Sequence, residues 1–192
     1  MLTGPDTHQH LATGFPIGER FHSAPVRRIA DGRPLGLGHV ARADGRWRLY
    51  LLADAARPED AGSPASVLLD FLATSPDSPL LRAAANGSDP AAVFDMRAVY
   101  QQGNRDVSVD QLHPLLLPTA GRLGLVDYEK AFTVDPASGE DLFDVRGIDR
   151  ARGALVVVRP DQYVAHVLPL DAHGELAGFF EQILRPAVPA AV

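Results

Sequence analysis

The sequence has 192 residues, of which 46% are hydrophobic and 22% charged, a composition typical of one ordinary soluble domain. A formal net charge of −6 argues against nucleic acid or an anionic membrane as the main partner. The absence of cysteine excludes disulfides, thiolate catalysis and thiolate metal sites. No apolar run approaches the ~20 residues of a membrane span and no signal peptide is evident, so we expect a cytoplasmic location.

The first 25 residues carry scattered glycines and prolines without a sustained period, a pattern typical of a linker or tail. Alternatively, this stretch is the remnant of something larger, and Phe15, Ile17 and Phe21 pack on a neighbour that is absent from this chain. We therefore divide the chain into a linker or tail over residues 1–25 and a folded domain over residues 26–192.

Turn residues and alternation predict the strands of the first half. Short strands are expected at Val26–Ala30 and Leu35–Ala43, with a turn at Asp31–Pro34 between them. The dipeptide Asp44-Gly45 is a strong hairpin turn, and Trp47–Ala53 follows it as a well-defined strand.

A loop over Ala55–Gly62 leads to the first predicted helix. Ser63 suits its N-cap, Pro64 suits its first turn, and Ser75-Pro76 ends it. Its apolar face would carry Val67, Leu68, Phe71 and Leu72. One or two further helical turns are expected over Leu80–Asn86.

The next predicted strand, Val93–Tyr100, has two different faces. One face would carry Phe94, Met96, Ala98 and Tyr100. The other would carry Asp95 and Arg97, which are near enough to pair. A half-polar face favours an edge strand or a partly exposed one.

The stretch between this strand and the C-terminal part has weaker patterns. We expect short helices at Val109–Leu117 and Tyr128–Phe132, each after an aspartate that could cap it. Ala137–Glu140 is expected to be a loop, and Leu142–Ile148 to be irregular.

The C-terminal part has the clearest pattern. Leu155–Val158 and Tyr163–Leu168 are predicted to form an antiparallel hairpin. The turn between them would contain Arg159, Pro160, Asp161 and Gln162, and Pro160 suits the second position of a type I turn. With Tyr163, these residues form the structural motif that we single out.

A final helix is predicted after the hairpin. Asp171 is a candidate N-cap, and Pro186 would stop the helix. Its apolar face would carry Leu176, Phe179, Phe180, Ile183 and Leu184. The low-complexity residues 186–192 are expected to be a frayed end.

The order of these elements is typical of an α/β fold with a thioredoxin-like mixed sheet of four or five strands and helices on both faces. A C-terminal β-hairpin followed by a helix would complete it, and no CxxC motif is present.

Three motifs were weighed as ligand or metal sites. Gly36–Ala41 matches G-x-G-x-x-A, but no strand precedes it and no helix follows, so two glycines in a strand or bulge are favoured over a dinucleotide loop. His8 and His10 are two potential metal ligands in a tail, where a solvated tail is favoured. His166 shares a predicted face with Val164 and Leu168, which favours a hydrogen-bonded or half-exposed histidine over a catalytic base.

The remaining charged candidates are also better explained structurally. Arg159 could bind a small acidic ligand, but in a turn it more commonly reaches a carbonyl or carboxylate. Asp141, Asp144 and Asp149 are spread along a loop, where solvation explains them. We assign no catalytic, cofactor-binding or metal-binding residue.

Five short segments resemble one protein family. The segments GIDR (147–150) and VVVRPDQYVA (156–165) are similar to the C-terminal end of the phenol hydroxylase and 3-hydroxybenzoate hydroxylase group of FAD-dependent aromatic-ring monooxygenases. Supporting likeness comes from GFPIGERFHSAPV (14–26), DGRWRLYLLAD (44–54) and LVDYEKAF (125–132). The resemblance covers most of the chain from about Gly14 onward.

The resemblance implies a thioredoxin-like C-terminal domain without the redox cysteine pair, serving dimerisation and packing against the catalytic part. Where a thioredoxin carries its CxxC motif, this chain has Ala55–Gly62. The family's flavin domain is missing, so FAD is expected only in the full-length, NAD(P)H-using enzyme and no cofactor in this chain. Expected partners are a second copy, the catalytic FAD domain, or both, and neither nucleic acid nor a membrane.

Two alternatives remain. The chain could be a standalone small enzyme or redox-related protein on a thioredoxin-like scaffold, although without cysteine it lacks the usual chemistry. It could also be a regulatory module that binds a small aromatic or acidic ligand at a sheet edge or near Arg159.

Overall fold

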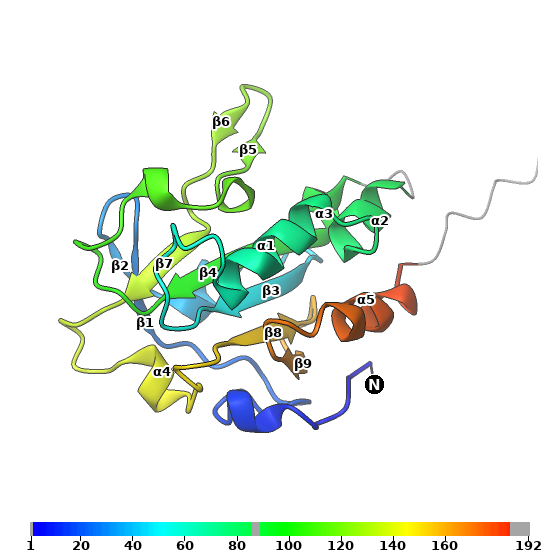
Figure 1. Cartoon of the computed structure of the whole chain (residues 1–192), viewed down its shortest axis with the longest axis horizontal. Helices are drawn as coiled ribbons and strands as arrows, with labels where there is room; N and C mark the ends of the chain where they lie inside the picture. Colours follow the sequence, from blue (N-terminus) through cyan, green and yellow to red (C-terminus); the bar gives the residue numbers. More distant parts are fainter. Residues whose placement is uncertain (1, 86–88, 185–192) are drawn as a thin grey trace, which may run out of the picture.

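The computed structural model describes residues 2–85 and 89–184 of the chain. Within these residues, one mixed sheet has the strand order β2-β1-β7-β4-β3-β8-β9 (Figure 1). The strands are β1 (Pro25–Arg28), β2 (Pro34–Gly36), β3 (Trp47–Leu52), β4 (Phe94–Tyr100), β7 (Ala131–Val134), β8 (Ala154–Val158) and β9 (Val164–Leu168). The pairs β3–β4 and β4–β7 are parallel, and the other neighbours are antiparallel. The sheet therefore has seven strands, where the sequence predicted four or five.

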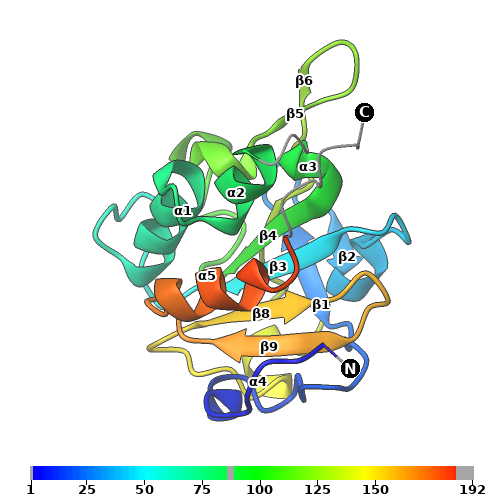
Figure 2. The same cartoon turned by 90° about the vertical axis from the view of Figure 1, so that its right-hand side faces the viewer.

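Helices cover both faces of the sheet, as predicted. One face carries α1 (Pro64–Thr74), α2 (Pro79–Ala85), α3 (Pro90–Val93) and α5 (His173–Glu181). The other carries α4 (Leu142–Val145) and the 3-10 turn η1 (Gln9–Leu11) (Figure 2). Because successive strand residues point to opposite faces, Leu49 and Leu51 of β3 join the first core, and Tyr50 and Leu52 join the second.

A second, two-stranded sheet stands apart from the main one. It pairs β5 (Thr119–Ala120) with β6 (Leu125–Val126) and projects from the body of the domain (Figures 1 and 2). We call residues 119–128 the arm. The sequence pattern did not reveal it, because each of its strands has only two residues and neither is buried.

The N-terminal segment packs on this domain itself. Leu11 and Phe15 are completely buried, and the Phe21 ring stacks at 4.3 Å on Tyr50. Gly18 N–H donates to the Val164 carbonyl at 2.9 Å, so the segment covers the edge of β9. The alternative in which Phe15 and Phe21 pack on an absent neighbour is thus wrong. The segment is irregular, and so periodicity could not detect its packing.

The C-terminal hairpin and helix are confirmed. Strands β8 and β9 pair antiparallel, and α5 follows them. The helix begins at His173, and Ala172 rather than Asp171 occupies the N-cap position, without a side-chain hydrogen bond. The predicted stop at Pro186 and the frayed end lie outside the described residues, as does Asn86 at the end of the second predicted helix.

Several weaker predictions need correction. Residues 128–130 are not helical and Ala131–Val134 is the buried strand β7, because a four-residue strand is too short for its alternation to be recognised. Beyond Gly36 the expected strand turns into the 3-10 helix η2 (Leu37–Val40). Val109–Leu117 contains two 3-10 turns, η3 (Val109–Gln111) and η4 (Pro114–Leu116). Asp141 caps the short α4 where irregular chain was expected.

Candidate functional site

Strand β4 is an interior strand, and the expectation of an edge or partly exposed strand is wrong. It lies between β3 and β7, and all seven of its residues are buried. Asp95 and Arg97 do pair, with Arg97 Nη2 2.9 Å from Asp95 Oδ2. The polar face remains buried because β3 and the residue before β7 bring further charges to it.

Four charged side chains form what we call the charge cluster: Arg48, Asp95, Arg97 and Lys130. Lys130 Nζ lies 2.8 Å from Asp95 Oδ1, and Arg48 Nε lies 3.8 Å from Asp95 Oδ2. The side chain of Asp95 is fully buried, and that of Lys130 is only 10% exposed. One carboxylate therefore serves three cations at the protein interior.

The electrostatics of the cluster keep Asp95 ionised. Burial raises the pKa of the Asp95 carboxyl, but the charges and hydrogen bonds of Arg97 and Lys130 outweigh burial and hold the pKa below its ordinary value. A carboxylate with a lowered pKa and both oxygens occupied is a poor proton acceptor. The arrangement can hold strands together, but it offers neither a base nor a nucleophile.

Carbonyl groups and peripheral carboxylates complete the cluster. Arg48 donates to the carbonyls of Arg46, at 2.8 Å, and Arg42, and it pairs with Asp44 at 2.8 Å. Arg97 Nη2 donates to the Val40 carbonyl at 3.0 Å. Breaking such a buried network by removing one partner is costly, because it leaves the remaining charges without compensation.

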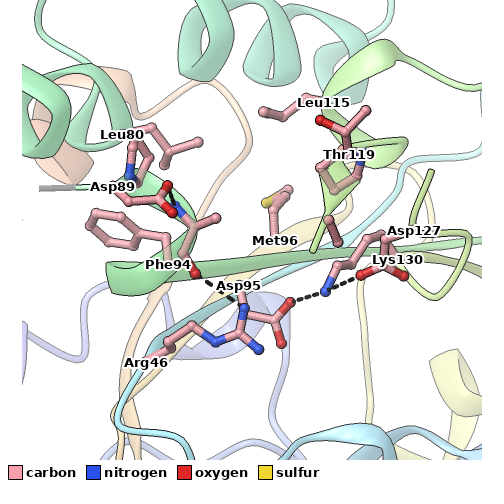
Figure 3. A pocket seen from close by; sticks show the side chains of 14 residues that line it. Arg46, Leu80, Asp89, Phe94, Asp95, Met96, Leu115, Thr119, Asp127 and Lys130 are labelled. Atoms are coloured by element: carbon pink, nitrogen blue, oxygen red, sulfur yellow. Dashed lines mark hydrogen bonds and ion pairs between the residues drawn. The ribbon is translucent and has the colours of Figure 1, made fainter. Parts of the chain in front are cut away.

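A groove of about 300 Å³ opens above one end of the cluster (Figure 3). Its walls are largely apolar, and its rim is charged. The apolar walls include Leu80, Phe94, Met96 and Leu115, and the charged groups are Arg46, Asp89, Asp95, Asp127 and Lys130. The groove lies where the parallel strands β4 and β7 begin, next to the start of β3.

The base of the arm is tied to the charge cluster. Lys130 Nζ, held by Asp95, also lies 3.1 Å from Asp127 Oδ2 (Figure 3). Asp127 N–H donates to the Pro118 carbonyl at 2.8 Å, which closes the hairpin at its root. The buried Asp95 at the start of β4 is thus connected to the arm through the ion pairs of Lys130.

The opposite end of the sheet holds a different buried carboxylate. Asp54 follows β3, and its Oδ1 accepts a hydrogen bond from Ala56 N–H at 3.3 Å. Burial raises the pKa of this carboxyl. Ser63 caps α1 as predicted, accepting from Ser66 N–H at 3.1 Å. Residues 53–63, which contain no cysteine, join β3 to α1 here.

The predicted structural motif lies in the turn between β8 and β9. Arg159 Nε donates to Asp161 Oδ1 at 3.0 Å, and the guanidinium stacks 5.5 Å from the centre of the Tyr163 ring. Gln162 has a φ of 69°, and Pro160 precedes Asp161 in the turn. The Arg159 side chain is thus engaged within the turn, and an acidic ligand there stays a prediction.

His166 is more buried than expected. It is 2% exposed, its ring lies 5.5 Å from that of Phe179, and burial lowers its pKa. It does not share a face with Val164, which belongs to the other core. The cause is a register shift in the β8–β9 pair, where Val157 pairs with His166 and Val158 with Val164.

The glycine pair Gly36 and Gly38 does not fit a dinucleotide cofactor such as FAD. Gly36 ends β2 and Gly38 lies within the 3-10 helix η2, so no α-helix N-terminus is there to meet a pyrophosphate. A Cβ atom at Gly36 would lie 2.9 Å from Ser23 Oγ, and one at Gly38 would lie 3.0 Å from Ser23 Cβ. Protein atoms therefore fill the space that a phosphate would need.

The other weighed side chains have local partners. His8 Nε2 lies 3.3 Å from Glu175 Oε2, and no group of three or more potential ligands that could hold a metal ion occurs within residues 2–85 and 89–184. Asp141 and Asp144 both pair with Arg150, at 2.9 and 2.8 Å, so solvation alone does not explain them. Asp149 accepts from backbone N–H groups of the following turn.

Sequence reasoning missed Arg48, Lys130 and the arm. Arg48 is an arginine inside an otherwise apolar strand, and Lys130 is the only lysine of the chain. Both were visible signals. Only the parallel pairing of β4 with β3 and β7 brings them to Asp95.

Comparison with known proteins gives one family match over nearly the whole chain. The family model described as "Phenol hydroxylase, C-terminal dimerisation domain" matches residues 1–188. The matched range includes the N-terminal segment that covers β9.

Curated relatives are much longer than this chain. A 3-hydroxybenzoate 4-monooxygenase of Comamonas testosteroni is 51% identical over 189 residues, which cover 96% of this chain and 29% of the relative. The FAD-dependent monooxygenase terD of Aspergillus terreus is 28% identical over 183 residues, which cover 94% of this chain and 30% of the relative. The chain thus spans about a third of the length of the relatives it matches.

Solved structures share the fold at low identity. The thioredoxin domain of a thiol-disulfide oxidoreductase from Bacteroides vulgatus gives a TM-score of 0.55 at 10% identity, covering 88% of this chain and 99% of that one. A thiol:disulfide interchange protein from Bacteroides sp. also gives 0.55, at 11% identity, covering 92% and 95%. The predicted thioredoxin-like fold is therefore confirmed. None of the helices in the described part of the chain is long and apolar enough to cross a membrane.

Proposed function

Because this chain belongs to the family of phenol hydroxylase C-terminal dimerisation domains, we propose that it joins two copies of a flavin-dependent aromatic hydroxylase and supports their structure. The observation that carries the proposal is the family match over residues 1–188, together with 51% identity to a 3-hydroxybenzoate 4-monooxygenase.

In this proposal the hydroxylation itself belongs to residues outside this chain. FAD, NAD(P)H and the aromatic substrate would be held by a flavin-binding part like that of the much longer relatives. Residues 1–25 would lead from that part into the thioredoxin-like domain over residues 26–192. Besides a second copy, the flavin-binding part is then the expected contact of this domain. A cytoplasmic location stays a prediction.

The chemistry of the described residues supports a structural role. In the most strongly buried ion-pair network, cationic side chains occupy both carboxylate oxygens of Asp95, and Lys130 ties the network to the surface arm. The space beside Gly36 and Gly38 is occupied by Ser23. Neither feature presents a reactive group to a substrate. Both therefore support a structural and associating role over a catalytic one.

Sedimentation equilibrium of the 192-residue chain over a dilution series tests the proposal. We expect a mass that moves reversibly between one and two chains as the concentration rises. A mass of one chain at every concentration up to the millimolar range would contradict self-association by this domain.

A further inference from the structure

Exposed apolar side chains concentrate on the arm. Large hydrophobic residues that are at least a third exposed in the described residues are Leu2, Val67, Leu123, Leu125, Val126, Tyr128 and Val145. Four of these seven lie between residues 123 and 128, and Leu123 is 83% exposed. Exposed apolar residues that are concentrated in one short segment, unlike scattered single residues, point to an interaction site.

The turn at the tip of the arm is formed by its own glycines and is not constrained by neighbouring residues. Gly121 and Gly124 have φ values of 70° and 61°, and Gly124 N–H donates to the Gly121 carbonyl at 3.2 Å. No atom lies within 4 Å of a Cβ added at either glycine, so the surroundings impose nothing on this turn. Its left-handed backbone is specified locally by glycine, and it places Arg122 and Leu123 at the outermost point.

The arm has a fixed base and an uncovered end. Asp127 binds the Pro118 carbonyl through its N–H and binds Lys130 through its carboxylate, and Lys130 is anchored by Asp95. An isolated two-stranded hairpin is marginal in water. A hairpin that is anchored at one end and apolar at the other is therefore suited to being covered by a partner.

The groove described above lies beside the arm's base. Thr119, Ala120 and Asp127 belong both to the arm and to the groove lining (Figure 3). Because the two features share residues, a two-fold axis passing near them would carry each arm over the groove of the other copy. The exposed Arg122 at the arm's tip and the exposed Asp89 at the groove also have opposite charges.

We propose that the arm of one copy lies in the groove of a second copy, and reciprocally, with Leu123 and Leu125 packing on the groove walls near Phe94 and Met96. This proposal rests on the proposed function and names the surface that performs it. Because the contact is reciprocal, each copy contributes both an arm and a groove to the interface.

Charge substitutions on the arm test the proposal. In the 192-residue chain, the double substitution Leu123→Asp with Leu125→Asp should raise the dimer dissociation constant at least ~100-fold, because two apolar side chains lose their burial. Val67→Asp on α1 and Val145→Asp on α4 are matched controls, since those residues are 43% and 44% exposed on other surfaces. Thermal unfolding of each variant, at a concentration where it is monomeric, should stay close to that of the wild-type monomer.

The outcomes separate this proposal from the proposed function. A wild-type dimer that persists unchanged in the arm variant overturns the arm–groove contact and leaves dimerisation standing. A wild-type chain that is monomeric throughout overturns both. Loss of the dimer in the control variants to the same extent as in the arm variant also overturns the specific role of the arm.

Cysteine cross-linking supplies a second test, because the natural chain contains no cysteine. Chains carrying only Leu123→Cys are mixed with chains carrying only Ala91→Cys, where Ala91 is an exposed residue of the groove lining. Mild oxidation should give a disulfide between the two kinds of chain, identified by peptide mass. A mixture with Val145→Cys in place of Ala91→Cys should not. Equal cross-linking in the two mixtures overturns the proposal.

Discussion

Opposite ends of the central sheet hold the buried carboxyl groups of Asp54 and Asp95, and the pKa values of the two groups are shifted in opposite directions. At the end where β3 leads into α1, burial raises the pKa of Asp54 and outweighs the hydrogen bond that its carboxylate accepts from Ala56 N–H at 3.3 Å. At the end where β4 begins, Arg97 and Lys130 hold the pKa of Asp95 low despite burial. Burial alone does not fix the state of a carboxyl group; the cations that the neighbouring strands supply decide it.

The two ends of the sheet also differ in the structural features that they carry. At the Asp54 end, residues 53–63 join β3 to α1 and contain no cysteine. The Asp95 end carries the charge cluster, the groove and the arm. The distinctive surface features of this domain therefore lie at the end of the sheet where β4 begins.

The largest expected effect is the loss of the charge cluster. Asp95→Ala leaves Arg48, Arg97 and Lys130 buried without their shared carboxylate, and should cost about 3–5 kcal/mol of unfolding free energy. Urea denaturation at neutral pH measures it. Asp31→Ala, which removes a surface pair with Arg28 and an exposed hydrogen bond from Arg33 N–H, is the control and should barely move the midpoint. Similar midpoints for the two variants would show that the cluster is not a special feature of this end.

Replacing glycine by alanine should cost more stability at the packed end of β3 than in the exposed arm. At Gly153, with a φ of 64°, an added Cβ would lie 2.5 Å from the Leu52 carbonyl oxygen and 2.8 Å from the Asp54 nitrogen. Gly153→Ala should cost about 3 kcal/mol, since both backbone strain and a backbone clash oppose it.

The matching variant in the arm is Gly124→Ala. Gly124 has a φ of 61° and open space around it, so only the left-handed backbone is penalised, by about 1 kcal/mol. Thermal unfolding of both variants is the measurement. Equal losses would mean that the arm is as tightly packed as the end of β3, contrary to the structure.

The smallest effect, with the opposite sign, is expected at Asp54. Because its folded-state pKa lies above the ordinary value of 3.8, the wild type loses stability as the pH rises from about 3.8 through that raised pKa. Asp54→Asn removes this loss, so the variant should be more stable than the wild type at pH 7. The gain should vanish as the pH falls toward 3.8.

The same titration series gives the contrasting sign for Asp95. Its lowered pKa contributes stability that is present above about 3.8 and is lost as the pH falls through the folded-state pKa. Subtracting the wild-type curve isolates Asp54, because groups such as His166 titrate in both proteins. A destabilised Asp54→Asn variant at neutral pH would show that Asp54 is stabilised rather than strained by its surroundings.

Local patterns were sufficient to predict the thioredoxin-like fold. The alternation of β3, the hairpin of β8 and β9, the Ser63 cap and the apolar face of α5 are all short-range signals. They fail where the packing is long-range and irregular, as in the N-terminal segment that hydrogen-bonds along β9. Two-residue strands such as β5 and β6 leave no period to detect.

Only part of the candidate site could be predicted from the sequence. The Asp95–Arg97 pair follows from spacing within one strand and is confirmed. Its burial does not follow, because Arg48 and Lys130 come from separate parts of the chain and meet it only through parallel pairing. A strand with one polar face is therefore compatible with solvent exposure or with a buried ion-pair network. Only the residues on the neighbouring strands decide between the two.

Hydrogen–deuterium exchange of the wild-type chain, compared at concentrations below and above the dimer dissociation constant, tests the central claim most directly. The account predicts that association increases the protection of amides in the arm, residues 119–128, and along the groove at residues 89–96. Residues 53–63, at the Asp54 end, should exchange equally at both concentrations. Concentration-dependent protection at residues 53–63 with none in the arm would contradict the assignment of association to the Asp95 end.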